Sequence, residues 1–201
     1  MAELSETLAS MLSKPQKNGK HYYFDGNVII CVDDVHFRVH ASILSMFSEF
    51  FKGILSGNWR ETDVQKYSCK HNEQNEKGIM AMVQINEKNP ADMEMLLSVV
   101  YNHTNTTLTL NDVETIIKLA TEYMFSNVIT WCDNFLQGEV YEKPLEVLIL
   151  ADRYHLSNSY KRSSDWVYDE YRFFSKQPEY EQLSLETRFQ LMKKRYIYVE
   201  D

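Results

Sequence analysis

The sequence predicts an α+β fold followed by an all-helical extension. Two spacings of apolar residues carry this prediction. From Val28 to Val39 apolar side chains recur at every second position, as in strands, and from Ile43 to Leu55 they recur with a period near 3.6, as in helices. Beyond residue 139 only the helical spacing is found, so the last part of the chain is expected to contain helices alone.

A β-hairpin followed by a helical run is expected near the start of the fold. The apolar positions of the two strands are Val28, Ile30, Val32, Val35, Phe37 and Val39. Between the strands, Asp33 and Asp34 suit a tight turn. The helical run then places on one face Ile43, Leu44, Phe47, Phe50, Phe51, Ile54 and Leu55. Gly57 and Asn58 predict the end of this run.

Further elements follow up to residue 138. Met80, Met82 and Ile85 alternate as in a strand. Asn89 and Pro90 suit the cap and the first position of a helix, whose apolar face is Met93, Leu96, Leu97, Val100 and Tyr101. Asn111 with Glu114 resembles a capping box for the next helix, and Gly138 marks the end of this part of the chain.

Three amphipathic helices are expected in the extension. The first covers residues 144–155, with Leu145, Leu148, Ile149 and Tyr154 at helical spacing. The second covers residues 160–174, with Trp166, Val167 and Phe173. The third covers residues 182–195, is capped by Ser184, and carries Leu185, Phe189 and Met192. These helices are too short to bury much core alone, so we expect them to pack on residues 108–138.

Two polar segments interrupt these patterns. Residues 14–20 are expected to be a linker after a terminal helix whose apolar stripe is Leu4, Leu8, Met11 and Leu12. That stripe packs either on its own molecule or on a second copy. Residues 62–78 lack both periods, and we interpret them as a mobile or disordered insertion, with a partner-contact loop as the alternative.

Composition argues against several classes of function. The chain has 201 residues, of which 44% are hydrophobic and 13% aromatic, and this suits a packed globule. A net charge of -8 disfavours nucleic-acid binding, which needs clustered Lys and Arg. No membrane span, signal peptide or disulfide framework is expected, so the protein is expected in the cytoplasm, the nucleus or both.

No arrangement of residues predicts catalysis, a metal or a cofactor. The sequence lacks GxSxG, P-loop and GxGxxG motifs, so we do not expect an enzyme. Cys69 and His71 offer only two ligands, whereas structural zinc sites usually need four. Cys132 lies among apolar helical neighbours and is expected to be an inert buried thiol.

The order of these elements resembles the BTB (POZ) domain, a small sheet flanked by a cluster of α-helices. The resemblance covers roughly residues 25–138. It is carried by Asn27-Val28, Phe37-Arg38-Val39-His40, Ile43-Leu44, Ser48-Glu49-Phe50-Phe51 and Ile54, and later by Tyr101, Leu108, Leu110, the helices that begin near Val113 and Val128, and the turn Tyr123-Met124-Phe125. In this family a histidine at the position of His40 orders the corner between hairpin and helix. The chain departs from the family pattern at Asn27, where aspartate is usual, and at Asn102-His103, where threonine-glycine is usual.

The resemblance implies three segments of the chain. Residues 1–20 would form an N-terminal helix and linker used in dimerisation, because in BTB homodimers this helix packs on the partner. Residues 21–138 would form the BTB domain, with the insertion at 62–78. Residues 139–201 resemble the opening helices of the BACK domain. The implied homodimer interface is Leu4, Leu8, Met11 and Leu12.

The resemblance also implies a binding site for the cullin-3 N-terminal domain. BTB proteins that recruit cullin-3 have a hydrophobic residue, any residue and a glutamate where this chain has Trp59, Arg60 and Glu61. An exposed Trp59 suits a binding hot spot, although it could instead fold back on the insertion. A second contact implied by the family is the turn formed by Tyr123, Met124 and Phe125, part of which should be exposed. The third contact implied by the family is the helix pair after the core, represented here by residues 145–168.

The leading hypothesis is therefore a non-enzymatic adaptor or scaffold that dimerises and recruits cullin-3 to form a ubiquitin ligase acting on an unknown protein client. The alternative is a BTB assembly module without cullin binding, such as a transcriptional co-regulator. A potassium-channel-type tetramerisation domain fits less well, because its zinc-ligating histidine and cysteines are not matched. No kelch, ankyrin or other receptor repeat is found in the sequence.

Overall fold

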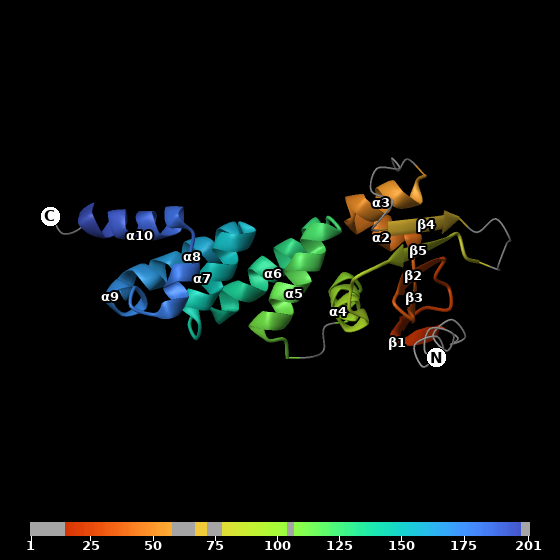
Figure 1. Ribbon diagram of the computed structural model, residues 1–201, viewed down its shortest axis with the longest axis horizontal. Coiled ribbons are helices and arrows are strands. Elements are labelled where there is room, and N and C mark those ends of the chain that lie inside the picture. Colours follow the sequence, from red (N-terminus) through yellow and green to blue (C-terminus); the bar gives the residue numbers. More distant parts are fainter. Residues whose placement is uncertain (1–14, 58–66, 72–77, 104–106, 198–201) are drawn as a thin grey trace, which may run out of the picture. The chain divides into compact units, whose positions relative to one another are not determined.

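The computed structural model describes residues 15–57, 67–71, 78–103 and 107–197 (Figure 1). These residues form two compact units. The first unit contains the described residues up to 103 together with 119–125, and the second contains 107–118 and 126–197. Helix α5 (Leu110–Glu122) contributes residues to both units.

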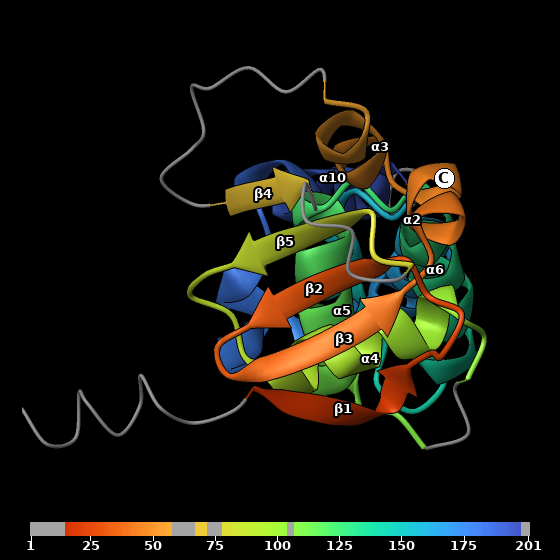
Figure 2. The same ribbon diagram turned by 90° about the vertical axis from the view of Figure 1, so that its right-hand side faces the viewer.

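The first unit is built on a mixed sheet whose described strands follow the order β1-β3-β2-β5-β4 (Figure 2). The strands are β1 (Gln16–Tyr22), β2 (Val28–Val32), β3 (Val35–Val39), β4 (Tyr67–His71) and β5 (Ala81–Ile85). β2 and β3 form the expected antiparallel hairpin, and β2 runs parallel to β5. All five residues of β2 are buried, because this strand lies at the centre of the sheet. The α+β prediction is confirmed.

The structure corrects the sequence interpretation at three strands. The linker expected over residues 14–20 is wrong from Gln16 onward, because this segment pairs with β3 as the parallel edge strand β1. The unstructured insertion expected over 62–78 is wrong for Tyr67–His71, which forms β4 on β5. The strand expected near Met80 is present as β5, but its buried face consists of Ala81, Val83 and Ile85.

Three described helices belong wholly to the first unit: α2 (Ala41–Phe47), α3 (Glu49–Leu55) and α4 (Pro90–Val100). The helical run predicted from Ile43 to Leu55 is therefore two short helices, separated at the buried Ser48. The predicted start of α4 is confirmed, since the Asn89 side chain accepts a hydrogen bond from the backbone N–H of Ala91 at 2.8 Å. α4 packs against β1 through two polar links, one of which joins His21 to Ser98.

The second unit is helical in its described residues. It contains α6 (Ser126–Glu139), α7 (Pro144–Tyr154), α8 (Ser157–Asp169), α9 (Tyr171–Phe174), the 3₁₀-helix η2 (Pro178–Gln182) and α10 (Leu185–Ile197). Its core is formed by Leu145, Leu148, Ile149, Val167, Phe174, Tyr180, Leu183 and Leu191. α6 packs on both α7 and α8. The prediction that the extension packs on residues 108–138 is thereby confirmed.

Helix α10 buries a different face from the one the sequence predicted. The predicted apolar face is exposed: Leu185 by 78%, Phe189 by 52% and Met192 by 41%. Thr187 and Leu191 are buried instead, and the Thr187 hydroxyl donates a hydrogen bond to Asp152 at 2.6 Å. The prediction of the buried face of this helix is therefore wrong. The predicted cap is confirmed, since Ser184 Oγ accepts from the N–H of Thr187 at 3.2 Å.

Candidate partner-binding site

The turn after α5 points one side chain out and two side chains in. The N–H of Phe125 donates to the carbonyl of Ala120 at 2.7 Å, and the N–H of Met124 donates to that of Thr121 at 3.3 Å. This pair of hydrogen bonds defines a Schellman motif, in which the residue in the left-handed conformation is usually glycine. Met124 occupies that position with φ 54°. The motif therefore fixes the direction of each side chain in the turn.

The exposure of the predicted contact residues in this turn follows from that geometry. Met124 is 57% exposed, whereas Tyr123 and Phe125 are fully buried. The expectation that part of the triplet is exposed is thus met by Met124 alone. A direct contact between this turn and a partner would be made by the Met124 side chain.

Ser48 ties the turn to the beginning of α3. Its hydroxyl donates to the carbonyl of Tyr123 at 2.5 Å and accepts from the N–H of Phe51 at 3.0 Å. The first bond joins residues far apart in the sequence, and the second caps α3. Because Ser48 is only 1% exposed, both bonds are sheltered from water. The Ser48 hydroxyl therefore links the beginning of α3 directly to the turn.

Aromatic packing reinforces this connection. The ring of Phe50 meets Tyr123 edge to face at 5.2 Å between centroids, and the ring of Phe51 lies 5.8 Å from that of Phe125. Such pairs add about 0.5–1.5 kcal/mol each beyond the area they bury. The two buried residues of the turn thus serve to hold the exposed one between them.

Charged side chains border this region. On α3, the Lys52 ammonium lies 3.1 Å from the Glu49 carboxylate, and both side chains are exposed. At the end of α5, Lys88 and Glu122 form a half-buried ion pair at 2.7 Å. Met124 is therefore an exposed apolar side chain on a surface that also carries charged residues. An apolar centre with a polar rim is common at protein interfaces.

The other predicted contact residues lie outside the described part of the chain. This holds for the cullin-contact residues Trp59, Arg60 and Glu61, and also for the dimer residues Leu4, Leu8, Met11 and Leu12. α3 ends at Leu55, four residues before Trp59. The structure therefore places the described part of the candidate site, formed by α3 and the turn 123–125.

The corner between the hairpin and α2 is organised by His40, as expected. Its Nδ1 lies 3.0 Å from the Tyr101 hydroxyl, and its Nε2 lies 3.2 Å from Asp25. Asn27 takes part as well, since its side-chain oxygen accepts a hydrogen bond from the N–H of Ala41 at 2.8 Å. This role of Asn27 was missed in the sequence, because the asparagine lies fourteen residues before the helix that it caps.

The described residues offer little for other chemistry. They contain no group of three or more His, Cys, Asp or Glu side chains able to hold a metal ion. Cys31 and Cys132 are free and buried, and burial raises the pKa of their thiols to about 11 and about 12. Within the same described ranges, none of the helices has the length and apolar content to cross a bilayer.

Comparison with known families agrees with this architecture. Residues 16–139 match the family model of the BTB/POZ domain. The match covers more than half of the chain and extends from the start of β1 to the end of α6. The chain belongs to the BTB/POZ domain family.

Similar proteins are found among the kelch-like proteins. The chain is 26% identical over 199 residues to kelch-like protein 22 of Xenopus tropicalis, which covers 98% of this chain and 28% of the relative. It is 24% identical over 174 residues to kelch-like protein 22 of Mus musculus and of Homo sapiens, covering 86% of this chain and 25% of each relative. The chain thus spans about a quarter of the length of these relatives.

Proposed function

We propose that this protein is a non-enzymatic BTB adaptor that dimerises and binds the N-terminal domain of cullin-3, and so presents a protein client to a ubiquitin ligase. The observation that carries the proposal is the exposed Met124, held on a rigid turn that is hydrogen-bonded to α3. Membership of the BTB/POZ family and similarity to kelch-like proteins support it. The chain after α3 leads to Trp59 and Glu61, the other proposed contacts.

The conformation of Met124 supports a binding role. A non-glycine residue in the left-handed region carries a backbone cost of about 1–2 kcal/mol. Glycine would avoid that cost, but it would present no side chain at the surface. Strained residues that persist in this way are concentrated at functional sites. A flexible, polarisable methionine also suits a contact with an apolar recess.

The proposed mechanism consists of binding alone. Trp59 fills an apolar recess of the cullin, Met124 packs beside it, and Arg60 and Glu61 contribute polar contacts at the rim. The stripe of Leu4, Leu8, Met11 and Leu12 joins two copies, and the dimer gains avidity toward clients with more than one binding segment. The protein acts in the cytoplasm, the nucleus or both.

Calorimetry with purified cullin-3 N-terminal domain tests this proposal. We expect Trp59→Ala to weaken binding by about 2 kcal/mol, or roughly thirtyfold, because tryptophan hot spots have this magnitude. Glu61→Lys and Met124→Gly should also weaken binding. The matched control is Met192→Gly, which removes a different exposed methionine and should leave the affinity unchanged.

Equal affinity of the wild-type chain and the three site variants would refute the site. Absence of cullin binding by the wild type would instead favour a BTB assembly module without ligase function, a reading favoured by the burial of Tyr123 and Phe125. Light scattering at tens of micromolar tests dimerisation separately. A wild type that is already monomeric there would contradict the proposed dimer, and Leu8→Asp is expected to produce the monomer.

A further inference from the structure

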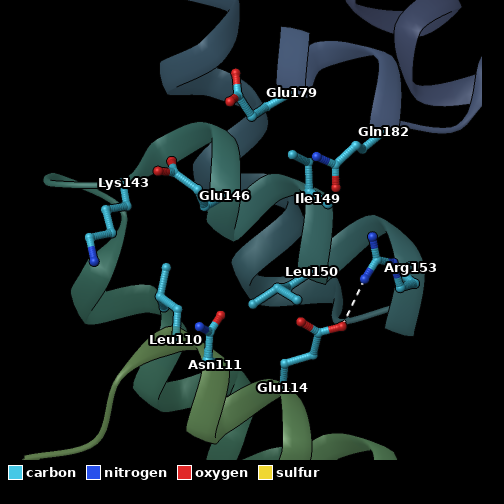
Figure 3. A pocket seen from close by; sticks show the side chains of 10 residues that line it. All are labelled: Leu110, Asn111, Glu114, Lys143, Glu146, Ile149, Leu150, Arg153, Glu179 and Gln182. Atoms are coloured by element: carbon cyan, nitrogen blue, oxygen red, sulfur yellow. Dashed lines mark hydrogen bonds and ion pairs between the residues drawn. The ribbon is translucent and has the colours of Figure 1, made fainter. Parts of the chain in front are cut away.

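The second unit contains a cleft between the first turns of α5, helix α7 and η2, closed at one end by the ion pair of Glu114 and Arg153 (Figure 3). Most of α7 belongs to residues 145–168, which the family resemblance assigns to the cullin contact, so a ligand of this cleft would share that surface. A site apart from all the proposed contacts is found in the first unit, where β1 packs on α4.

The side chain of Asn18 joins β1 to α4 through its carboxamide. Its Nδ2 donates a hydrogen bond to the Glu94 carboxylate at 2.7 Å. Its Oδ1 accepts from the backbone N–H of His21 at 2.7 Å and from that of Lys20 at 2.9 Å. A carboxamide both donates and accepts hydrogen bonds, whereas a carboxylate only accepts them. The bond to Glu94 therefore depends on the amide nitrogen of Asn18.

The residue after Asn18 makes this carboxamide chemically labile. Asn18-Gly19 is the only Asn-Gly step in the sequence. Gly19 is exposed, and a Cβ placed on it would meet no atom within 4 Å. Without a side chain at Gly19, its backbone nitrogen is unshielded and reaches Cγ of Asn18 once the chain is free to turn. Asparagine is among the thermolabile residues, and an Asn-Gly step favours its loss of ammonia.

β1 is a weakly attached strand. It lies at the edge of the sheet, and its pairing with β3 is irregular between Lys17 and Tyr22. Only His21 is buried among its seven residues. Segments with few buried side chains open locally at a small part of the free energy of global unfolding. We therefore expect transient openings of β1 to release Asn18 from α4.

We propose that Asn18 is a deamidation site, protected while β1 is docked on α4 and reactive when β1 opens. The backbone nitrogen of Gly19 forms a bond to Cγ of Asn18, and the bond between Cγ and Nδ2 breaks. Nδ2 leaves as ammonia, together with the proton that the Gly19 nitrogen gives up. Water then adds to the cyclic imide and opens it to aspartate or isoaspartate. The product carries a negative charge that Asn18 lacks.

This product does not renew the bond to α4. A carboxylate at position 18 has no hydrogen to donate, and it would face the Glu94 carboxylate where a hydrogen bond of 2.7 Å now lies, so the two charges repel. In the described part of the chain, neither Lys17 nor Lys20 forms an ion pair with Glu94, and the Lys17 ammonium lies over the ring of Tyr22. Deamidation therefore favours the open strand and makes a reversible opening lasting.

Peptide mapping by mass spectrometry measures the reaction. The full chain is kept in mildly alkaline buffer with and without guanidinium chloride, and conversion of Asn18 adds about 1 Da to its peptide because NH₂ is replaced by OH. We expect a rate at least about tenfold higher in the denaturant, because the docked strand reacts only during openings. Glu94→Ala should raise the rate in native buffer. The matched control is Glu142→Ala, which removes an exposed carboxylate outside this contact and should leave the rate unchanged.

Hydrogen exchange of the β1 amides measures docking in the same proteins. Asn18→Asp, which mimics the product, should speed this exchange at least about tenfold. Asn18→Asp with Glu94→Gln should restore slow exchange, because the glutamine amide donates to the new carboxylate and the donor and acceptor are exchanged. Gly19→Ala separates the chemistry from the docking. It should keep slow exchange, since a methyl group has room there, and should slow deamidation in the denaturant.

Four results would overturn the inference. The first is deamidation of Asn18 that is as fast in native buffer as in the denaturant, or absent from both. The second is a rate for Glu94→Ala no higher than for Glu142→Ala. The third is equal exchange of β1 in the wild type and Asn18→Asp, and the fourth is failure of Glu94→Gln to reverse the effect of Asn18→Asp. The reaction involves neither Trp59 nor Met124, so these outcomes are independent of cullin-3 binding.

Discussion

Asp133 on α6 holds the beginning of α8 through Ser159. Its Oδ1 accepts hydrogen bonds from the backbone N–H of Ser159 at 2.8 Å and from the Ser159 hydroxyl at 2.5 Å. Its Oδ2 accepts from the Asn158 side chain at 3.0 Å. Leu156, at the cap position of α8, supplies no side-chain acceptor. A neighbouring helix therefore provides the cap that the local sequence lacks.

Asp133→Asn should lower the free energy of unfolding by about 2–3 kcal/mol, because an amide NH₂ would face donors in a site that is only 7% exposed. Urea unfolding followed by circular dichroism measures this change. The control is Asp165→Asn, which removes an exposed ion pair with Lys194 and should cost below about 1 kcal/mol. Equal losses in the two variants would show that the cap from α6 contributes no more to the free energy of unfolding than an exposed ion pair does.

Met124→Gly should leave the free energy of unfolding unchanged or raise it by up to about 1 kcal/mol, because glycine adopts the left-handed conformation without steric cost. Met192→Gly, in the middle of α10, should instead lower it by about 1 kcal/mol. Chemical unfolding of the two variants side by side measures the difference. If Met124→Gly is as damaging as Met192→Gly, the turn does not have the conformation described.

His21 should make the protein less stable as the pH falls from 6.5 toward 4. The imidazole is fully buried, with Nε2 at 3.0 Å from the Ser98 hydroxyl. Burial, together with the charge of Lys20, lowers its pKa from 6.5 to about 4. In that window the unfolded chain binds a proton that the folded chain does not. The free energy of unfolding should therefore decrease by about 3 kcal/mol across the window and stay flat above it.

His21→Gln provides the test, since glutamine does not titrate and retains a group able to bond Ser98. Urea midpoints of both proteins from pH 4 to pH 8 should converge at low pH and diverge at high pH. Acidic groups that titrate in the same range are common to both proteins, so the difference isolates His21. Parallel pH profiles would contradict the lowered pKa.

The hairpin, the start of α4 and the α+β class could be predicted from the sequence, because each has a local cause in alternation, capping or period. β1 could not be. Its residues are mostly polar and exposed, and the strand exists because β3 offers a parallel edge and because Asn18 and His21 bond to α4. The pairing partner lies far along the chain, where no local pattern reports it.

The candidate site could be predicted only in part, because its local pattern is visible in the sequence and its long-range contacts are not. Three consecutive apolar residues indicate that one of them must face outward, but they do not indicate which one. The choice of Met124 follows from the Schellman hydrogen bonds and from Ser48, whose hydroxyl binds the carbonyl of Tyr123. The buried face of α10 was missed because it combines Leu191 with Thr187, a polar residue whose hydroxyl bonds to Asp152 and which no apolar spacing indicates.

The cap that Asn27 provides for α2 has a consequence for the conditions under which this corner stays intact. The family pattern has an aspartate at this position. The strength of a carboxylate as a hydrogen-bond acceptor depends on its ionisation, and dissolved ions weaken it by screening. A carboxamide is neutral at every accessible acidity. The hydrogen bond from the N–H of Ala41 to Asn27 is thus insulated from changes in proton and electrolyte concentration.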